Sequence, residues 1–240
     1  MFNEAILRNQ VEENGFTICD DILSAQEIRS LLGAIERIDQ VGSVRKRGGI
    51  FAVRNLLEVS EEVRQLAESA VVRALVRTVL GTRFIPVRGI LFDKIPDANW
   101  KVPWHQDVTV AVRERVESEG FGPWSVKADV LHVQPPAFVL EQMISVRIHL
   151  DPCGESNGAL RVIPGSHRRG RIPEDEIEAV RFKGPEEICA VKAGGALLMR
   201  PLLLHASSTS TVPDHRRVIH IDFSSAQLPN GMRWYSEQPV

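Results

Sequence analysis

Apolar residues recur at helical spacing through the first third of the chain. One such stretch begins at Ser24, which together with Glu27 has the Ser-x-x-Glu form of a capping box. Its apolar face comprises Ile28, Leu31, Leu32, Ile35 and Ile38. A second helical stretch runs from 60 to 80, with Gly81 in the position of a C-cap. We therefore predict a mainly helical N-terminal part over about residues 1–81, with one short strand at 15–18.

From Arg83 onward the pattern changes to period two, which is typical of strands with one buried face. Residues 143–150 are the clearest case, because Ile144, Val146 and Ile148 alternate with polar neighbours. The other candidate strands are 84–94, 104–112, 159–163, 196–204 and 217–223. Many short strands after a helical start, without a βαβ rhythm, predict a mainly β fold with flanking helices. We expect a double-sheet jelly roll with its core at about 83–224, buttressed by the N-terminal helices.

Residues 113–140 show neither helical nor strand periodicity. The residues that punctuate this segment are Gly120, Gly122, Pro123, Pro135 and Pro136. We predict an irregular insertion that serves as a lid or as a substrate wall, because a loop this long inside a compact domain is usually functional. The chain has no internal repeat and no convincing linker, so we expect a single domain over residues 1–240.

Composition and charge narrow the possible functions. The 240 residues are 43% hydrophobic with a formal net charge of -2, which gives no basic footprint for nucleic acid or for a membrane surface. The N-terminus lacks the apolar core of a signal peptide, and no apolar run is long enough to span a bilayer. Cys19, Cys153 and Cys189 are odd in number and unpatterned, which is typical of reduced thiols. We predict a cytoplasmic protein with a small-molecule substrate and no nucleic-acid or membrane partner, and leave its oligomeric state open.

The first candidate chemistry is the pair His105 and Asp107. On a strand the two side chains would leave the same face and could hold two cis positions of a divalent metal. A His hydrogen-bonded to a nearby acid is the alternative, and this pair by itself does not decide between them. His205 has the setting of a third ligand, because it ends an apolar run and precedes small polar residues at what would be a barrel mouth. Two His and one carboxylate form the facial arrangement typical of non-haem Fe(II) oxygenases.

The other histidines have less specific settings. His167 lies in a turn and is expected to be structural, and His149 and His220 lie within strands as satisfied core histidines. His215 precedes two arginines in a loop and is expected to be solvated. His132, in the insertion, could either meet substrate or be structural.

Four motifs in order make the chain resemble the phytanoyl-CoA dioxygenase-like family of Fe(II)/2-oxoglutarate oxygenases. The motifs are Trp104-His105-Gln106-Asp107, the segment from Asn157-Gly158 to His167, His205-Ala206-Ser207, and Arg216 eleven residues past His205. Their order and spacing agree with the family over roughly residues 12–224. One departure is Ala206, where the family usually has Gly; a methyl group there should be tolerated.

The resemblance implies a double-stranded β-helix (jelly roll, cupin-like) core. It also implies iron bound by His105, Asp107 and His205, and 2-oxoglutarate anchored by Arg216 with help from Ser207. Two imidazoles and one carboxylate leave three adjacent positions open, two for the keto acid and one for O2. The far carboxylate of 2-oxoglutarate suits a bidentate Arg better than a Lys.

The resemblance thus implies an oxidoreductase, a dioxygenase that hydroxylates a small organic metabolite and releases succinate and CO2. The retained Asp107 argues against halogenation, because related halogenases leave that position open for halide. The alternatives are a cupin-like metal enzyme without a keto-acid co-substrate and a non-catalytic barrel binding protein. Loss of a metal ligand would favour the latter, and all three ligands are present. The substrate, the site of oxidation and the insertion residues that contact substrate stay open, because function depends on the site and not on the fold.

Alternation along the last strand distinguishes Arg216 from its neighbour Arg217. Residues that share the parity of Arg217 are apolar, namely Ile219, Ile221 and Phe223. Residues that share the parity of Arg216 are Val218, His220 and Asp222, a more polar set that suits a barrel interior. We therefore predict that Arg216, and not Arg217, faces the co-substrate.

Overall fold

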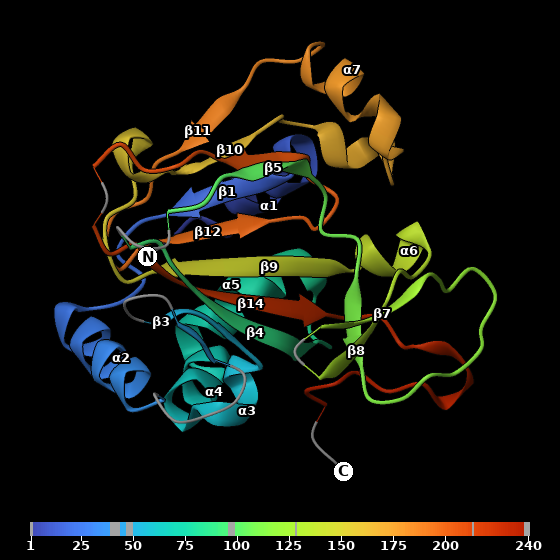
Figure 1. The fold of residues 1–240 in the computed structure, drawn as a ribbon, viewed down its shortest axis with the longest axis horizontal. Coiled ribbons are helices and arrows are strands. Elements are labelled where there is room, and N and C mark those ends of the chain that lie inside the picture. The colour runs from blue at the N-terminus through green and yellow to red at the C-terminus, as the bar shows by residue number, and fades with distance from the viewer. Residues whose placement is uncertain are drawn as a thin grey trace.

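A computed structural model describes residues 2–38, 44–46, 50–95, 99–127, 129–212 and 214–237, and its strands pair into three antiparallel sheets. The largest sheet crosses the middle of the molecule (Figure 1) and has seven strands in the described part of the chain. In spatial order they are β1 (Phe16–Cys19), β12 (Ala196–Met199), β9 (Met143–His149), β14 (Arg217–Ser224), β4 (Ile85–Asp93), β3 (Ile50–Arg54) and β2 (Val44–Lys46).

A second, four-stranded sheet packs against one face of this main sheet. Its strands in spatial order are β11 (Glu187–Cys189), β10 (Leu160–Val162), β13 (His205–Ser207) and β5 (Val102–His105). Phe16 of β1 and Leu197 of β12 are buried together with Leu160 of β10, so the two sheets share a core. Two facing antiparallel sheets with helices outside them form the predicted mainly β, jelly-roll fold.

A third sheet lies beside one end of the other two (Figure 1). Its strands in spatial order are β6 (Val110–Val112), β8 (Val130–Val133) and β7 (Trp124–Lys127). Strands β7 and β8 form an antiparallel hairpin. This hairpin comes from the segment in which the sequence predicts an irregular insertion.

Helices of the N-terminal part cover the outer face of the main sheet. They are α1 (Glu4–Asn14), α2 (Ala25–Arg37), α3 (Leu56–Val59), α4 (Glu61–Glu68) and α5 (Ala70–Leu80). The shorter helices α6 (Ala137–Leu140) and α7 (Ile177–Arg181) follow β8 and precede β11. Short 3-10 turns occur at Glu155–Asn157, Ser166–Arg169, Glu174–Glu176 and Pro229–Gly231.

Period-two alternation gives the main sheet one apolar and one polar face. On β14, Ile219, Ile221 and Phe223 are fully buried beneath the helices. The intervening His220 and Asp222 face the space between the sheets and are also buried. Burial of each large apolar side chain contributes about 1.5–3 kcal/mol, so the helical layer stabilises the sheet whose other face carries buried polar groups.

Most of the predicted elements are confirmed. Ser24 and Glu27 form the predicted capping box at the start of α2, and the predicted strand at 15–18 is β1. Ser60 caps α4, and Gly81 with a φ of 78° ends α5. The predicted single helix between them is two helices, because the Ser69 side chain accepts a hydrogen bond from Val72 N and starts α5 anew.

Three predictions about the elements are wrong in detail. The N-terminal part is less purely helical than expected, since β2 and β3 extend the main sheet. The predicted strand 104–112 is two strands in different sheets, β5 and β6, separated at Gln106. The predicted strand 196–204 ends at Met199, so His205 begins β13 and does not end an apolar strand.

The segment 113–140 is also more ordered than predicted. Val130 and Val133 of β8 are buried with Val139 and Leu140 of α6, in a core that includes Trp234. The apolar alternation of residues 130–133 is too short to distinguish a strand from a loop, and its pairing partners lie elsewhere in the chain. Within the described residues, no helix has the length and apolar character needed to cross a membrane.

Hydrogen exchange tests the hairpin. Strand β8 lies between β6 and β7, whereas β7 is an edge strand with one free side. We expect amides of 130–133 to exchange more slowly than those of 124–127, because edge strands open at lower free energy. Exchange of the whole segment 113–137 at the rate of an unstructured peptide would instead support an irregular insertion.

Candidate functional site

The strand register brings two histidines side by side. His105 on β5 pairs directly with His205 on β13, and the centroids of their rings lie 4.2 Å apart. Asp107 follows β5, and its carboxylate oxygens lie 3.9 Å from His105 Nε2 and 3.7 Å from His205 Nε2. One donor atom from each residue lies within 4.8 Å of the other two. The three groups are therefore placed to converge on one metal ion.

Hydrogen bonds fix both imidazoles in the orientation that a metal requires. His105 Nδ1 lies 2.8 Å from the Pro103 carbonyl oxygen, and His205 Nδ1 lies 2.8 Å from that of Leu203. A carbonyl oxygen can only accept, so each Nδ1 carries the proton and donates it. Each Nε2 lone pair is thereby left free for the metal, which is the usual role of such outer partners.

The environment also favours the protonation states of metal ligands. Burial lowers the pKa of His205 to about 4, which keeps the imidazole neutral. Burial by itself would raise the pKa of Asp107, but nearby positive charge, including Arg88, outweighs it and holds the pKa below its usual value. A neutral His and an ionised carboxylate can coordinate without first losing protons.

Asp107 is oriented by contacts distant in sequence and not by strand alternation. Strand β5 ends at His105, and Asp107 N donates to the Pro201 carbonyl oxygen at 2.9 Å. The side chain of Gln106 makes two bonds: its Nε2 donates to the Leu202 carbonyl oxygen at 2.6 Å, and its Oε1 accepts from Ile172 N at 2.8 Å. These bonds turn the chain so that Asp107 faces the histidines. Asp107 and His105 are therefore close as predicted, but the predicted reason, their position on one face of a single strand, is wrong.

A cavity of about 370 Å³ opens beside the three ligands. Five of its described lining residues carry a guanidinium or an ammonium group. Asp107 is the one acidic residue in the described lining. The basic residues are Arg54, Arg88, Lys127, Arg147 and Arg216. The cavity is strongly electropositive, which favours anionic ligands.

Arg216, Lys94 and Ser207 lie together at one end of this space. Lys94 Nζ donates to Ser207 Oγ at 2.8 Å and also to the Ser208 carbonyl oxygen. Arg216 Nη1 donates to the Gly158 carbonyl oxygen and lies 3.5 Å from Ser207 Oγ. We call Lys94, Arg147, Arg216 and Ser207 the anchor cluster.

Positive charge in the anchor cluster is not balanced by a carboxylate within the described residues. Lys94 is 1% exposed, Arg216 4% and Arg147 7%, and none of them forms an ion pair with a described residue. The Nε atoms of Arg147 and Arg216 have no hydrogen-bond partner among the described residues. Such groups are costly to bury unless a ligand satisfies them, so the chemistry of the cluster fits a carboxylate.

Arg216 and Arg217 lie on opposite faces of the strand end. Arg216 is buried and lines the cavity, whereas Arg217 binds Asp151 through Nε at 2.8 Å and Nη2 at 2.7 Å. This placement agrees with the predicted alternation. It leaves the role of Arg216 toward a co-substrate as a prediction.

Gly158 provides the space that the anchor cluster needs. Its φ is 76°, a left-handed conformation that L residues rarely adopt. A Cβ at this position would lie 2.6 Å from the Ser208 carbonyl oxygen and 3.0 Å from Lys94 Nζ. The Asn157-Gly158 motif therefore has a physical reason in this chain.

A buried hydrogen-bond chain runs along the inner face of the main sheet. Arg147 Nη1 donates to His220 Nδ1 at 2.9 Å, so His220 Nε2 donates to Asp222 at 2.8 Å. Asp222 also accepts from Ser145 Oγ and from Arg88 Nε, both at 2.6 Å. Arg88 and His220 outweigh the burial of Asp222 and hold its pKa well below the usual value. This chain connects the anchor cluster with Arg88.

The remaining histidines are placed partly as predicted. His167 is structural, with Nε2 3.3 Å from the Glu12 carbonyl oxygen, and His220 is satisfied on both nitrogens. His149 is not: both ring nitrogens lack a partner, and burial holds its pKa well below the usual value. His215 is not simply solvated, because its Nδ1 lies 2.7 Å from Asp93. His132 is buried and does not line the cavity at the metal ligands.

Sequence reasoning assigned no contact to Lys94 and no role to Arg147. Lys94 is the last residue of a predicted strand, and nothing local indicates that its side chain reaches Ser207, 113 residues later. Arg147 shares its face with His149 in the alternating strand β9. A buried basic residue on an otherwise apolar strand is the signal that could have identified it.

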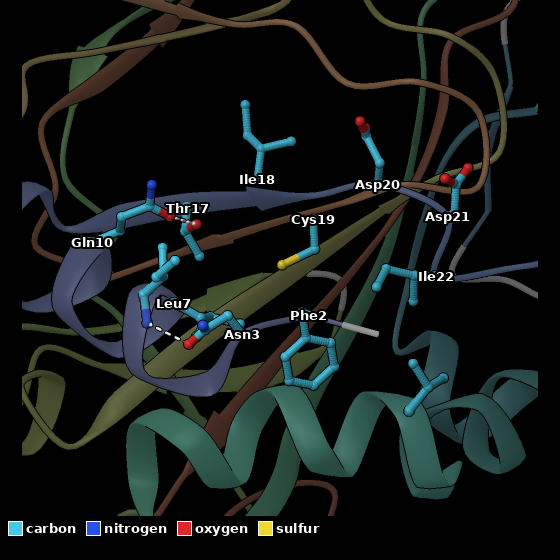
Figure 2. Close-up of a pocket in the computed structure, with 12 residues that line it drawn as sticks. Phe2, Asn3, Leu7, Gln10, Thr17, Ile18, Cys19, Asp20, Asp21 and Ile22 are labelled. Atoms are coloured by element: carbon cyan, nitrogen blue, oxygen red, sulfur yellow. Dashed lines mark hydrogen bonds between the residues drawn. The ribbon is translucent and has the colours of Figure 1, made fainter.

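A larger cavity of about 620 Å³ lies on the helical side and shares no residue with the metal site. Figure 2 shows that Phe2, Leu7, Ile18 and Ile22 surround it, with Asp20 and Asp21 at one side. Its lining is mainly apolar, and its titratable groups do not include a metal-ligating set among the described residues. The candidate metal ligands line the smaller, electropositive cavity.

The chain is similar to known proteins over most of its length. The profile of the family "Phytanoyl-CoA dioxygenase (PhyH)" matches residues 11–218. The peroxisomal phytanoyl-CoA dioxygenase of Mus musculus is 23% identical over 254 residues, which cover 91% of this chain and 68% of that protein.

Solved structures share the fold at low sequence identity. EctD from S. alaskensis, with 2-oxoglutarate and 5-hydroxyectoine, has a TM-score of 0.71 and 19% identity, covering 92% of this chain and 76% of its own. The epimerase SnoN, in complex with Fe3+, alpha ketoglutarate and nogalamycin RO, has a TM-score of 0.69 and 17% identity, covering 95% and 91%. At this identity the likeness establishes the jelly-roll fold.

Removal of any one of the three ligands tests the metal site. We expect His105→Ala, Asp107→Ala and His205→Ala each to weaken Fe(II) binding by at least about 100-fold, since even the loss of an outer partner costs roughly 10–100-fold. The fold should be kept, because the three side chains line a cavity and do not belong to the apolar core. Anaerobic calorimetry with Fe(II) measures the affinity, and near-normal binding by Asp107→Ala would exclude this site.

Lys94 provides a test that separates stability from binding. Burial, and then the charge of Arg216, lower its pKa to about 7. The unfolded state therefore binds more protons between about pH 7 and 10.5, and the penalty of burying this ammonium is largest at or below pH 7. We expect Lys94→Met to raise the free energy of unfolding of the unliganded protein at pH 7 by on the order of 2 kcal/mol, since each pKa unit corresponds to about 1.4 kcal/mol.

The increase in the free energy of unfolding caused by Lys94→Met should become smaller toward pH 10. The same variant should lose most of the thermal stabilisation that 2-oxoglutarate gives to the wild type. Thermal unfolding of the wild type and the variant at pH 7 and pH 10, with and without 2-oxoglutarate, measures both effects. Equal stabilisation of both proteins by 2-oxoglutarate would remove Lys94 from the binding site.

Proposed function

The chain belongs to the phytanoyl-CoA dioxygenase (PhyH) family, and from that premise we propose that it is an Fe(II)- and 2-oxoglutarate-dependent dioxygenase. It hydroxylates a small organic metabolite, with O2 as co-substrate and succinate and CO2 as products. The observation that carries the proposal is the joint lining of one cavity by three metal-ligating groups and a buried Arg. His105, Asp107 and His205 would hold the metal, and Arg216 and Ser207 would bind 2-oxoglutarate.

The ligand set suits iron in this role. Two neutral imidazoles and one carboxylate would leave a bound Fe(II) with a single residual positive charge and room for further ligands. Iron bound there would supply the redox chemistry that activates O2. The protein's contribution is to keep both Nε2 atoms deprotonated through the bonds to Pro103 and Leu203, and to keep Asp107 ionised.

The anchor cluster supplies what the distal carboxylate of a keto diacid needs. Arg216 offers a planar guanidinium with an unsatisfied Nε, and Lys94 offers an ammonium already oriented by Ser207. Their burial excludes water, so charge-assisted bonds to a carboxylate would be strong. The cluster would hold the distal carboxylate and leave the other end of the keto acid for the metal ligands.

The two alternatives are less well supported. A metal enzyme without a keto acid would have no use for the buried cations of the anchor cluster, which are costly to maintain without an anion. A binding protein without turnover would have no reason to keep three convergent ligands and two oriented imidazoles. Hydroxylation is the reaction that we propose. SnoN, which is named an epimerase, is an example of a different reaction on this fold.

We also propose that the protein acts in the cytoplasm on a free small molecule. The support is its three cysteines, all free thiols buried in the fold. Burial raises the pKa of Cys19 to about 11 and that of Cys189 to about 12, which keeps these thiols protonated and unreactive. A reducing compartment is the usual setting for such thiols.

The direct test is Fe(II)-dependent conversion of 2-oxoglutarate to succinate under air. We expect slow succinate release without substrate and none in the absence of Fe(II). A protein loaded with Fe(II) that releases no succinate, with or without candidate substrates, would reject the dioxygenase proposal in favour of a metal enzyme without a keto acid.

Arg216 and Arg217 form a matched pair of variants. Arg216→Gln should raise the concentration of 2-oxoglutarate needed for half-maximal succinate release by about 100-fold or more. The reason is that losing one partner of a buried charged pair costs about 2–5 kcal/mol and each 1.4 kcal/mol is a factor of ten. Arg217→Gln should change it little, because Arg217 binds Asp151 outside the cavity. The reverse ranking would show that the wrong Arg faces the co-substrate.

A further inference from the structure

We propose that the cavity holds a second anion site, formed by Lys127 with Arg88, that binds a carboxylate or phosphate monoester on the substrate. The inference rests on the proposed function, because it concerns the molecule to be oxidised beside the metal. It narrows the substrate to a compound with an apolar body and an anionic end.

The two basic ends of the cavity are separated along β14. Arg216 precedes the strand, and Arg88 binds Asp222, six residues further on. At about 3.3 Å per residue these positions are roughly 20 Å apart along the backbone. Arg216 and Arg88 therefore lie toward opposite ends of β14, and Arg88 with Lys127 is a group of cations that the anchor cluster does not include.

The electrostatic environment of each Lys agrees with this separation. Burial, and then the charges of Arg88 and Arg54, lower the pKa of Lys127, whereas Asp107 acts in the opposite direction. Lys94 is influenced instead by Arg216 and Arg147. Asp107 raises the pKa of both Arg147 and Lys127, so its carboxylate is close enough to influence both groups.

Lys127 has no counter-charge of its own in the described part of the chain. Its Nζ donates to the neutral hydroxyl of Thr109 at 3.0 Å, and it forms no ion pair with a described residue. Arg88 is different, because its Nε already binds Asp222; Arg88 therefore contributes hydrogen-bond donors to the site, and Lys127 contributes the unbalanced charge. A half-buried ammonium that faces a cavity and binds only a hydroxyl is satisfied best by an anion.

The walls between the two ends are apolar. Ile90 and Phe92 of β4, Trp100 and Val108 line the same cavity as Lys127. Its volume of about 370 Å³ is in the range of small-molecule sites. An aliphatic or aromatic body would contact these side chains and pass the metal ligands, with its anionic group at Lys127.

Lys127 lies on β7, in the hairpin that follows the metal-binding segment. Among the described residues of 113–140, Lys127 is the one that lines this cavity, so it is the contact through which the hairpin would meet the substrate.

Matched probes test the site without knowledge of the natural substrate. The probes are C6–C10 straight-chain carboxylates, their primary amides, which keep the shape but lose the charge, and the corresponding alkyl phosphate monoesters. Binding to the anaerobic Fe(II)–2-oxoglutarate complex is measured by calorimetry. The variants are Lys127→Met, Lys127→Arg as a charge-conserving rescue, and Lys183→Met as a control at an exposed Lys outside the cavity.

We expect the wild type to bind at least one anionic class about ten-fold or more tightly than the amide, which corresponds to about 1.4 kcal/mol. The preference should disappear in Lys127→Met, return in Lys127→Arg and persist in Lys183→Met. The comparison of carboxylate with phosphate monoester identifies which anion the site takes. Equal binding of acids and amides, or no binding of either acid, would overturn the proposal.

Two further results separate this inference from the proposed function. If Lys127→Met loses affinity for 2-oxoglutarate itself, Lys127 belongs to the co-substrate site and the second site is rejected, while the dioxygenase stands. If the wild type forms no succinate but still prefers the anionic probes in a Lys127-dependent way, the anion site stands and the dioxygenase fails.

Discussion

Positive charge buried without an anion is the constraint on which the rest of this structure depends. Lys94, Arg147 and Arg216 lie on the inner side of the main sheet, and none of them forms an ion pair with a carboxylate among the described residues. Such charges are costly to bury, and the apolar layer of helices on the other face offsets that cost. A ligand that carries carboxylates would recover the lost solvation, so the charge that weakens the free protein favours its complex.

The three candidate metal ligands line the electropositive cavity. Asp107 is the one acidic group among the described residues lining the cavity. Asp222 lies on the inner face of the main sheet, where it accepts hydrogen bonds from Arg88 and His220. The hydrogen-bond chain Arg147–His220–Asp222–Arg88 restrains these side chains and has a positively charged Arg at each of its ends.

Local chemistry explains which features the sequence could predict. The capping box at Ser24 and the alternation along β9 and β14 are decided by neighbours in the chain, and the site triad follows from motif spacing. The break after His105 could not be predicted, because Gln106 is held by Leu202 and Ile172. The pairing of β8 with β6 and the reach of Lys94 to Ser207 also depend on residues distant in sequence. Their prediction requires the sheet order, which periodicity does not contain.

The most direct measurement is an anaerobic titration of the Fe(II)-loaded protein with 2-oxoglutarate, followed through the weak visible charge-transfer band of the chelate. 2-Oxopentanoate, which has the same chelating end but no distal carboxylate, is the matched comparison. The account predicts a saturable band with 2-oxoglutarate, and a band with 2-oxopentanoate only at concentrations about 100-fold higher or more, because the anchor cluster then has no carboxylate to bind. Equal affinities for the two keto acids, or no band with iron properly loaded, would contradict it.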